Sequence, residues 1–205
     1  FESAEGYSAG LLQSDPIWRI SGFSYPEIGA FGFGTGFGME LDQEATVSVD
    51  FFSATASPVG WVDFYVKPAF SDPAMLPTRF ALGQAALTGF VAVDSQGVVY
   101  VLHGDGQGNG IWRSTGYSVP TANRVATDWL RMTYRLDYDT LSWDLYLNDQ
   151  LQMINLGFVD ATVPPLSAFR LQGSTEGPTQ FDQFSAGFTN PLFTDSDNDG
   201  MPDAF

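Results

Sequence analysis

The chain has no cysteine among its 205 residues and a single histidine, His103. Without cysteine there are no disulfides, thiolate nucleophiles or zinc-thiolate sites, although this does not place the protein inside the cell. Only 8 Lys and Arg stand against 24 Asp and Glu, for a formal net charge of −16. Such an acidic surface repels nucleic acid and anionic lipid, so we expect neither as a partner.

Long apolar runs and amphipathic helical patterns are also missing. No segment approaches the roughly 18 consecutive apolar residues of a membrane span, so we expect no membrane insertion. The chain opens at Phe1 without a basic leader, and we expect any secretory signal to have been removed. Period-two alternation, the pattern of half-buried strands, dominates instead.

The clearest unit is a hairpin from Trp129 to Leu147 around the turn 137–140. Leu130, Met132, Tyr134 and Leu136 on one strand have the parity to pair with Leu141, Trp143, Leu145 and Leu147 across a four-residue loop. Further strands are expected over these ranges: 45–51, 61–67, 90–93, 98–103, 168–172 and 180–188. Many short strands joined by Gly, Pro and Asp turns predict an all-β, antiparallel two-sheet β-sandwich of the jelly-roll type.

Length and pattern together predict one large β domain with a short extension. We assign 1–188 to the jelly-roll sandwich, 189–194 to a linker and 195–205 to a truncated calcium-binding repeat. The alternating Phe and Gly of 29–38 suggest a strand that lays Phe31, Phe33 and Phe37 into the core. A ligand-facing aromatic patch is the alternative for this segment.

The segment from Asp195 to Asp203 has the spacing of a calcium loop. Asp195, Asp197 and Asp199 alternate before a turn at Gly200, and the carbonyl of Met201 and the carboxylate of Asp203 would complete an oxygen shell. Carboxylates packed so closely repel each other unless a cation lies among them. We therefore predict bound calcium, with a disordered acidic tail as the alternative.

The run DSDNDGMPDAF at 195–205 resembles a thrombospondin type 3 repeat. That resemblance implies calcium binding in an extracellular protein. An EF-hand-like loop takes a bidentate carboxylate at its twelfth position, which here would be residue 206, beyond Phe205. We therefore expect this chain to be part of a longer secreted or cell-surface protein, with its other domains as partners.

The predicted hairpin resembles the signature hairpin of laminin G-like and concanavalin A-like domains. The matching residues are Trp129, Asp137 and the run 145–149, while Gln150 replaces the family's closing glycine. The two ends of the chain resemble the first and last strands of carbohydrate-binding β-sandwich families. By that resemblance, Glu2 and Asp182 are candidate ligands of a second, structural calcium.

The strand 61–67 carries the candidate glycan-binding residues. Trp61, Asp63, Tyr65 and Lys67 share one face, and sugars stack their C–H faces on aromatic rings beside planar polar groups. In the alternative reading, Trp61 caps the core and Asp63 pairs with Lys67. Trp112 is a further candidate for stacking, and a core position is its alternative.

The basic residues and the search for catalytic motifs give little support for an anion-binding groove or for an enzyme. Arg131, Arg135 and Arg170 would form an anion-binding groove if they shared one face, and cross-strand pairing with Asp144 is the alternative. The carboxylate-rich strands of glycoside hydrolases and the Gln-x-His pair of jelly-roll lyases are both lacking. Nothing near His103 in sequence orients it for catalysis. We therefore expect no enzyme.

These observations favour a non-catalytic, lectin-like carbohydrate-binding module of a larger secreted protein, stabilised by calcium, with a polysaccharide or glycan as partner. Two alternatives remain open. One is a calcium-dependent structural or adhesive surface domain that binds no sugar. The other is a polysaccharide lyase or hydrolase with atypical residues.

Overall fold

A computed structural model of the chain describes residues 7–22, 24–34, 36–42, 45–51, 57–69, 88–122, 125–174 and 177–193. Within these ranges the ordered elements are β-strands, without any helix. The predicted all-β antiparallel sandwich is therefore confirmed. None of the described residues belongs to an apolar helix of the length needed to cross a membrane.

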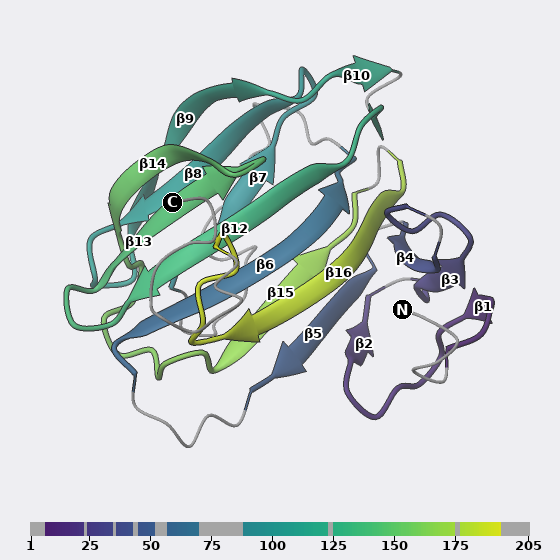
Figure 1. Cartoon of the computed structure of the whole chain (residues 1–205), viewed down its shortest axis with the longest axis horizontal. Coiled ribbons are helices and arrows are strands. Elements are labelled where there is room, and N and C mark those ends of the chain that lie inside the picture. The colour runs from purple at the N-terminus through teal and green to yellow at the C-terminus, as the bar shows by residue number, and fades with distance from the viewer. Residues whose placement is uncertain are drawn as a thin grey trace.

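One layer of the sandwich is an eight-stranded sheet in which all pairs are antiparallel. From one edge to the other, its strands are β1 (Gly10–Leu11), β3 (Glu27–Gly29), β4 (Gly38–Leu41), β16 (Thr179–Gly187), β6 (Val59–Lys67), β12 (Leu130–Asp137), β13 (Ser142–Leu147) and β14 (Gln150–Gly157). We call this the large sheet. Figure 1 views its outer face, with β6, β12 and β16 running across the front.

Two three-stranded sheets lie behind the large sheet (Figure 1). The first has the order β15 (Ala168–Gln172), β5 (Thr46–Asp50) and β2 (Arg19–Ser21). The second has the order β7 (Val91–Val93), β8 (Val98–Gly104) and β9 (Gly110–Ser118). A short ribbon of β10 (Thr121–Ala122) and β11 (Val125–Ala126) completes the described strands.

A single main core fills the space between the large sheet and the two smaller ones. Buried aliphatic side chains from the large sheet, such as Met132, belong to one cluster with Val47 of β5 and Val101 of β8. Aromatic rings join the layers, since Phe64 of β6 meets Phe169 of β15 edge-on at 5.1 Å. Such ring pairs add about 0.5–1.5 kcal/mol to the area they bury.

The predicted β12–β13 hairpin is confirmed, with the predicted parity of its side chains but a register shifted by two residues. Tyr134 pairs with Leu145 and Leu136 with Trp143. Leu141, predicted to lie in the second strand, is instead a turn residue with φ of 51°. It is also exposed at the surface. The four-residue loop therefore comprises residues 138–141, one position later than predicted.

The predicted β7–β8 hairpin is also present, and Asp94 explains its turn. One carboxylate oxygen of Asp94 accepts hydrogen bonds from the backbone N–H groups of Gln96 and Val98, at 2.8 and 2.9 Å. Gly97 follows with φ of +81°, a conformation that favours glycine. The predicted strands at 168–172 and 180–188 correspond to β15 and β16.

The chain does not leave the sandwich immediately after β16. In Figure 1 the segment after β16 turns back across the front of β6 towards β12. Phe188 packs against the core at the start of this segment. The predicted linker residues up to 193 therefore lie against the large sheet, while the assigned domain boundaries themselves stay a prediction.

Candidate functional site

The outer face of β6 carries the four residues that the alternation places together. Val62, Phe64 and Val66 are buried in the core. Because side chains alternate along a strand, the opposite face of β6 belongs to Trp61, Asp63, Tyr65 and Lys67. The shared face is as predicted, but the four side chains differ in accessibility.

The expectation that Trp61 presents an open ring is wrong. Trp61 is only 7% exposed. It lies on a central strand, and its ring is 6.3 Å from that of Tyr146 on β13. On the β12 side Trp61 is in register with Arg135, and Tyr146 packs beyond it, so this ring offers little surface for stacking.

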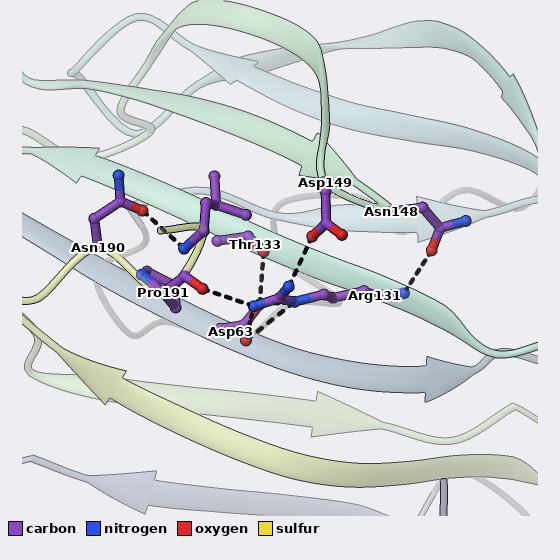
Figure 2. Close-up of polar contacts among 8 residues, drawn as sticks. Asp63, Arg131, Thr133, Asn148, Asp149, Asn190 and Pro191 are labelled. Carbon is purple, nitrogen blue, oxygen red and sulfur yellow. Dashed lines mark hydrogen bonds and ion pairs between the residues drawn. The ribbon is translucent and has the colours of Figure 1, made fainter. Parts of the chain in front are cut away.

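Asp63 is buried and belongs to a polar cluster that spans two strands (Figure 2). The Thr133 hydroxyl donates to its Oδ1 at 2.6 Å, and Arg131 donates from Nε to Oδ1 at 3.0 Å and from Nη2 to Oδ2 at 2.9 Å. Asp63 therefore pairs with Arg131, and not with Lys67 as the alternative prediction had it. A buried carboxylate held this way is a structural anchor.

The guanidinium of Arg131 has further partners beyond Asp63. Nη1 donates to Asp149 Oδ1 at 2.7 Å and Nη2 donates to the Pro191 carbonyl at 3.0 Å (Figure 2). The hydrogen bonds with Asp63 raise the pKa of Arg131 above its ordinary value, against the lowering effect of burial. An arginine with these commitments has little capacity to grip an external anion.

Next to this cluster lies a group of three half-buried rings, Phe33, Tyr65 and Trp129, which we call the aromatic patch. Phe33 stacks on Tyr65 with centroids 3.9 Å apart, and its ring meets Trp129 edge-on at 6.1 Å. The Arg131 guanidinium carbon lies 5.9 Å from the Tyr65 centroid. The patch thus combines rings from a loop, from β6 and from the start of β12.

Phe33 reaches the patch because residues 30–34 and 36–37 belong to a loop and not to the predicted strand. Gly34 has φ of +82°, which breaks an extended backbone. A Cβ on Gly32 would come within 2.6 Å of the Phe37 carbonyl oxygen, so the loop closes tightly at a glycine. The Phe and Gly alternation is thus compatible with a turn, and the alternative of an outward aromatic patch describes Phe33 better.

Asp182, a predicted calcium ligand, holds this loop in place. Its Oδ2 accepts the Phe33 backbone N–H at 2.8 Å, and its Oδ1 accepts the N–H of Gln183 at 2.8 Å. An irregular pairing of β16 between Asp182 and Ser185, with Gln183 at φ of 50°, accompanies this arrangement. The buried carboxylate thus fixes the position of the Phe33 ring over Tyr65.

The structure does not describe the other predicted calcium ligands. Glu2, Asp195, Asp197, Asp199, Met201 and Asp203 lie outside the described residues. In the described part of the chain, no three His, Asp or Glu side chains gather as metal ligands would. Calcium binding at either site therefore stays a prediction.

Trp112 and the aromatic patch lie on different sheets. Trp112 is on β9, where it pairs with Leu102 of β8. Its half-buried ring packs edge-on against Phe90 at 5.8 Å in a small cluster that includes Val159. Trp112 therefore does not extend the surface formed around Tyr65.

Lys67, the last of the four candidate residues on β6, is half-buried at the end of this strand. It is in register with Gln180 of β16.

The three arginines of the predicted groove are also separated. Arg170 is on β15 of a small sheet, away from Arg131 and Arg135 on β12. Arg135 pairs with Asp144 at 3.3 Å and with Asp137 at 3.0 Å. The cross-strand pairing predicted as the alternative is thus confirmed, and the groove of three arginines is wrong.

His103 has a structural hydrogen bond. Its Nδ1 accepts the backbone N–H of Gly157 at 3.0 Å, which ties β8 to β14 across the two layers. Partial burial, with a smaller contribution from Arg113, lowers the pKa of His103 below its usual 6.5. A neutral imidazole is required, because the protonated ring has no acceptor for this N–H.

No family model matches the sequence, and no curated protein matches it. A sialidase has a similar fold, with a TM-score of 0.51 and 10% identity over 89% of this chain and 18% of the sialidase chain. Domain 4 of AbnA, an extracellular arabinanase from Geobacillus stearothermophilus in complex with arabinotriose, gives 0.47 at 13% identity over 84% of both chains. The receptor-binding domain of botulinum neurotoxin mosaic serotype C/D gives 0.46 at 12% identity over 82% of this chain and 41% of that one.

These identities are low, so the likeness to the sialidase speaks for the fold alone. It is consistent with an all-β, jelly-roll-like sandwich. This chain corresponds to only 18% of the sialidase's length. The resemblances to laminin G-like domains and to thrombospondin repeats stay predictions.

Proposed function

We propose that this chain is a non-catalytic carbohydrate-binding module of a longer secreted protein, and that it contacts its glycan through the aromatic patch. The observation that carries the proposal is the half-open stack of Phe33 on Tyr65, with Trp129 beside it. Phe33 and Tyr65 cover one face of each other, so the patch offers the remaining exposed ring surface to the C–H groups of a sugar. Tyr65 thus stays a candidate, while the binding surface moves from Trp61 to this group.

Polar groups for sugar hydroxyls border the patch. The side chain of Asp149 is 58% exposed, although Nη1 of Arg131 already donates to one of its oxygens. A carboxylate has acceptor capacity for more than one donor, so Asp149 retains lone pairs for a hydroxyl. Asn148 lies beside it on the same turn, where its Oδ1 accepts the Arg131 backbone N–H at 3.0 Å and its Nδ2 donates to the Tyr117 hydroxyl at 2.9 Å, so Asn148 fixes the turn that carries Asp149. The arrangement pairs an apolar platform with a polar rim.

The acids around the patch are better suited to support than to catalysis. Asp63 and Asp182 are buried and accept hydrogen bonds from fixed donors. A glycoside hydrolase needs two carboxyl groups that face a scissile bond, with one of them free to give or take a proton. Tightly hydrogen-bonded carboxylates favour binding over turnover.

A binding measurement tests the proposal directly. We expect affinity electrophoresis or calorimetry with a panel of neutral and acidic polysaccharides to reveal binding. Tyr65→Ala or Trp129→Ala should weaken it by about tenfold, since each removes a stacking ring. Ile111→Ala, which removes a 60% exposed side chain from β9, is the control and should bind normally.

Trp112→Ala separates this site from the other predicted one. If Trp112→Ala abolishes binding while Tyr65→Ala leaves it intact, the glycan contacts the smaller sheet and the patch is not the site. Absence of binding to every glycan would contradict the proposal. It would favour a calcium-dependent structural or adhesive domain, which the burial of Trp61 also suits.

We also propose calcium as the bound metal. The ligands would be Asp195, Asp197, Asp199, Asp203 and the Met201 carbonyl, with Glu2 and Asp182 at a second site. Ligand binding to the native state stabilises it. Chelation should therefore lower the melting temperature of the whole domain if Glu2 and Asp182 bind calcium. If only the 195–203 loop binds, the melting temperature of the sandwich should stay constant.

A further inference from the structure

A hollow lies at the edge of the sandwich, where the chain crosses from β2 to β3. It has a volume of about 250 Å³ and is lined by Ile20, Ser21, Gly22, Ser24 and Tyr25. Tyr25 is 52% exposed, so its ring is much more open than those of the aromatic patch. None of these residues belongs to the polar cluster or to the patch.

The walls of this hollow are held by the fold. Ser21 ends β2 and pairs with Thr46 of β5. Gly22, with φ of +114°, then turns the chain away from the sheet. On the far side, the Ser24 hydroxyl donates to the Asp42 carbonyl at 2.6 Å. The oxygen of Ser24 therefore keeps its acceptor lone pairs while its position is fixed.

The backbone at Tyr25 is restrained by its neighbours in sequence. The next residue is Pro26, whose ring restricts the backbone of the residue before it. Pro26 is buried, and its carbonyl accepts the Leu12 N–H at 2.7 Å. An exposed aromatic ring on a restrained backbone loses less freedom on binding than a ring on a mobile loop.

The lining selects an uncharged ligand. Among the described residues that line it are two hydroxyls, one phenol and one aliphatic side chain, and none of these residues is charged. The net charge of −16 opposes an anionic ligand at this edge. The volume is below the roughly 300–1,000 Å³ of pockets for drug-sized molecules, so a small ligand fits better.

From this geometry we infer that the Tyr25 hollow is a second glycan contact that takes one neutral sugar ring. The ring's C–H face stacks on Tyr25, and its hydroxyls exchange hydrogen bonds with Ser21 and Ser24. The inference rests on the proposed function in its ligand class, but on a separate set of residues. Two separate contacts on one module raise the avidity for a polymer that reaches both.

The test is an amide NMR titration of the intact chain with neutral trisaccharides of glucose, xylose, mannose, galactose and arabinose. Weak single-ring sites call for concentrations up to about 10 mM. We expect at least one sugar to shift the amides of residues 20–25 with its own saturation curve. Tyr25→Ala should weaken that curve by about tenfold, and Tyr25→Phe should retain most of the affinity.

A second variant guards against an effect on folding. Ser21→Gln extends a side chain from an exposed strand end into the hollow, and it should block the sugar while the melting temperature stays near wild type. If no neutral sugar shifts residues 20–25, or if Tyr25→Ala leaves the curve unchanged, the inference is overturned.

The two sites fail independently. Shifts at Tyr65 and Trp129 without shifts at Tyr25 would overturn this inference and leave the proposed function standing. Shifts confined to residues 20–25 would support this inference and contradict the aromatic patch as the site. Silence at both sites would overturn this inference, while the proposed function would still be decided by the panel that includes acidic polysaccharides.

Discussion

The two ends of β6 differ on the outer face of the large sheet. At one end, Trp61 and Asp63 are buried, and Asp63 is saturated by donors from β12. At the other end, Tyr65 is half-open under the ring of Phe33. The two pairs come from one strand and one alternation, yet only the second leaves aromatic surface for a ligand.

The difference arises because a different chain segment covers each end of β6. The carbonyl of Pro191, in the segment after β16, lies on Arg131 beside Asp63. At the other end, the ring of Phe33 stacks on Tyr65. One crossing closes a polar cluster, and the other extends an aromatic surface. Two segments that are distant in sequence therefore contact the same face of β6 with opposite effects on its accessibility.

Removal of Asp63 should have the largest effect at the closed end. Asp63→Ala leaves Arg131 and Thr133 without their shared acceptor, and breaking a buried pair costs about 3–5 kcal/mol. We expect a loss of about 3 kcal/mol in the free energy of unfolding, measured by urea denaturation.

The matched control removes the charge of the exposed partner of the same guanidinium. Asp149→Asn should cost less than about 1 kcal/mol, because solvent screens that pair and Asn tolerates the φ of 65° at this position. Equal losses for Asp63→Ala and Asp149→Asn would show that the buried Asp63 is not what holds the cluster.

A substitution at the open end should cost somewhat less and act on binding. The Cβ of Gly32→Ala would come within 2.6 Å of the Phe37 carbonyl oxygen and 2.8 Å of Asp182 Oδ2. The loop has to shift, at a cost of about 1–3 kcal/mol. We expect lower stability in urea denaturation and weaker glycan binding, since Phe33 moves off Tyr65.

Gly187→Ala is the control for this substitution, because a Cβ there meets nothing within 4 Å. It should leave stability within about 0.5 kcal/mol of wild type and glycan binding unchanged. Normal glycan binding by Gly32→Ala would mean that the Phe33 stack is not needed for the ligand.

Protonation of His103 should have a smaller effect on stability. This residue links β8 to β14. The folded-state pKa of His103 is lowered, so its stabilising contribution is present above pH 6.5 and is lost as the pH falls through the folded value. The lost hydrogen bond to Gly157 amounts to about 1 kcal/mol.

His103→Phe removes the titrating group and isolates this effect. Urea denaturation across pH 4.5 to 7.5 should show a steeper loss of stability below about pH 6.5 in the wild type than in the variant. Parallel profiles for the two proteins would show that His103 does not cause the loss of stability at low pH.

The smallest effect is expected for an ion pair that lacks burial. Arg19 on β2 pairs with Asp50 on β5 at 2.6 Å, with the arginine side chain 73% exposed. Arg19→Ala should change the free energy of unfolding by less than about 0.5 kcal/mol, measured by urea denaturation. A loss comparable to that of Asp63→Ala would contradict burial as the source of the difference.

Much of the fold could be predicted because its strands alternate cleanly. The β12–β13 pairing and the outer face of β6 both follow from side-chain parity, a local property of the backbone. The loop that carries Phe33 is a strand in the prediction because Phe and Gly alternation suits a strand and a glycine turn alike. No sequence pattern marks Tyr25, because a single tyrosine beside a proline has no periodicity.

The amino-acid sequence by itself determined the all-β class, the strand faces and the acidic surface, since these depend on the order and count of residues. Tertiary structure alone decided which polar-face residues are open. The bond from Phe33 to Asp182 joins residues 149 apart in sequence, and the bond from Arg131 to Pro191 joins residues 60 apart. Periodicity reports the face on which a side chain lies, but it carries no information about the segment that later covers that face.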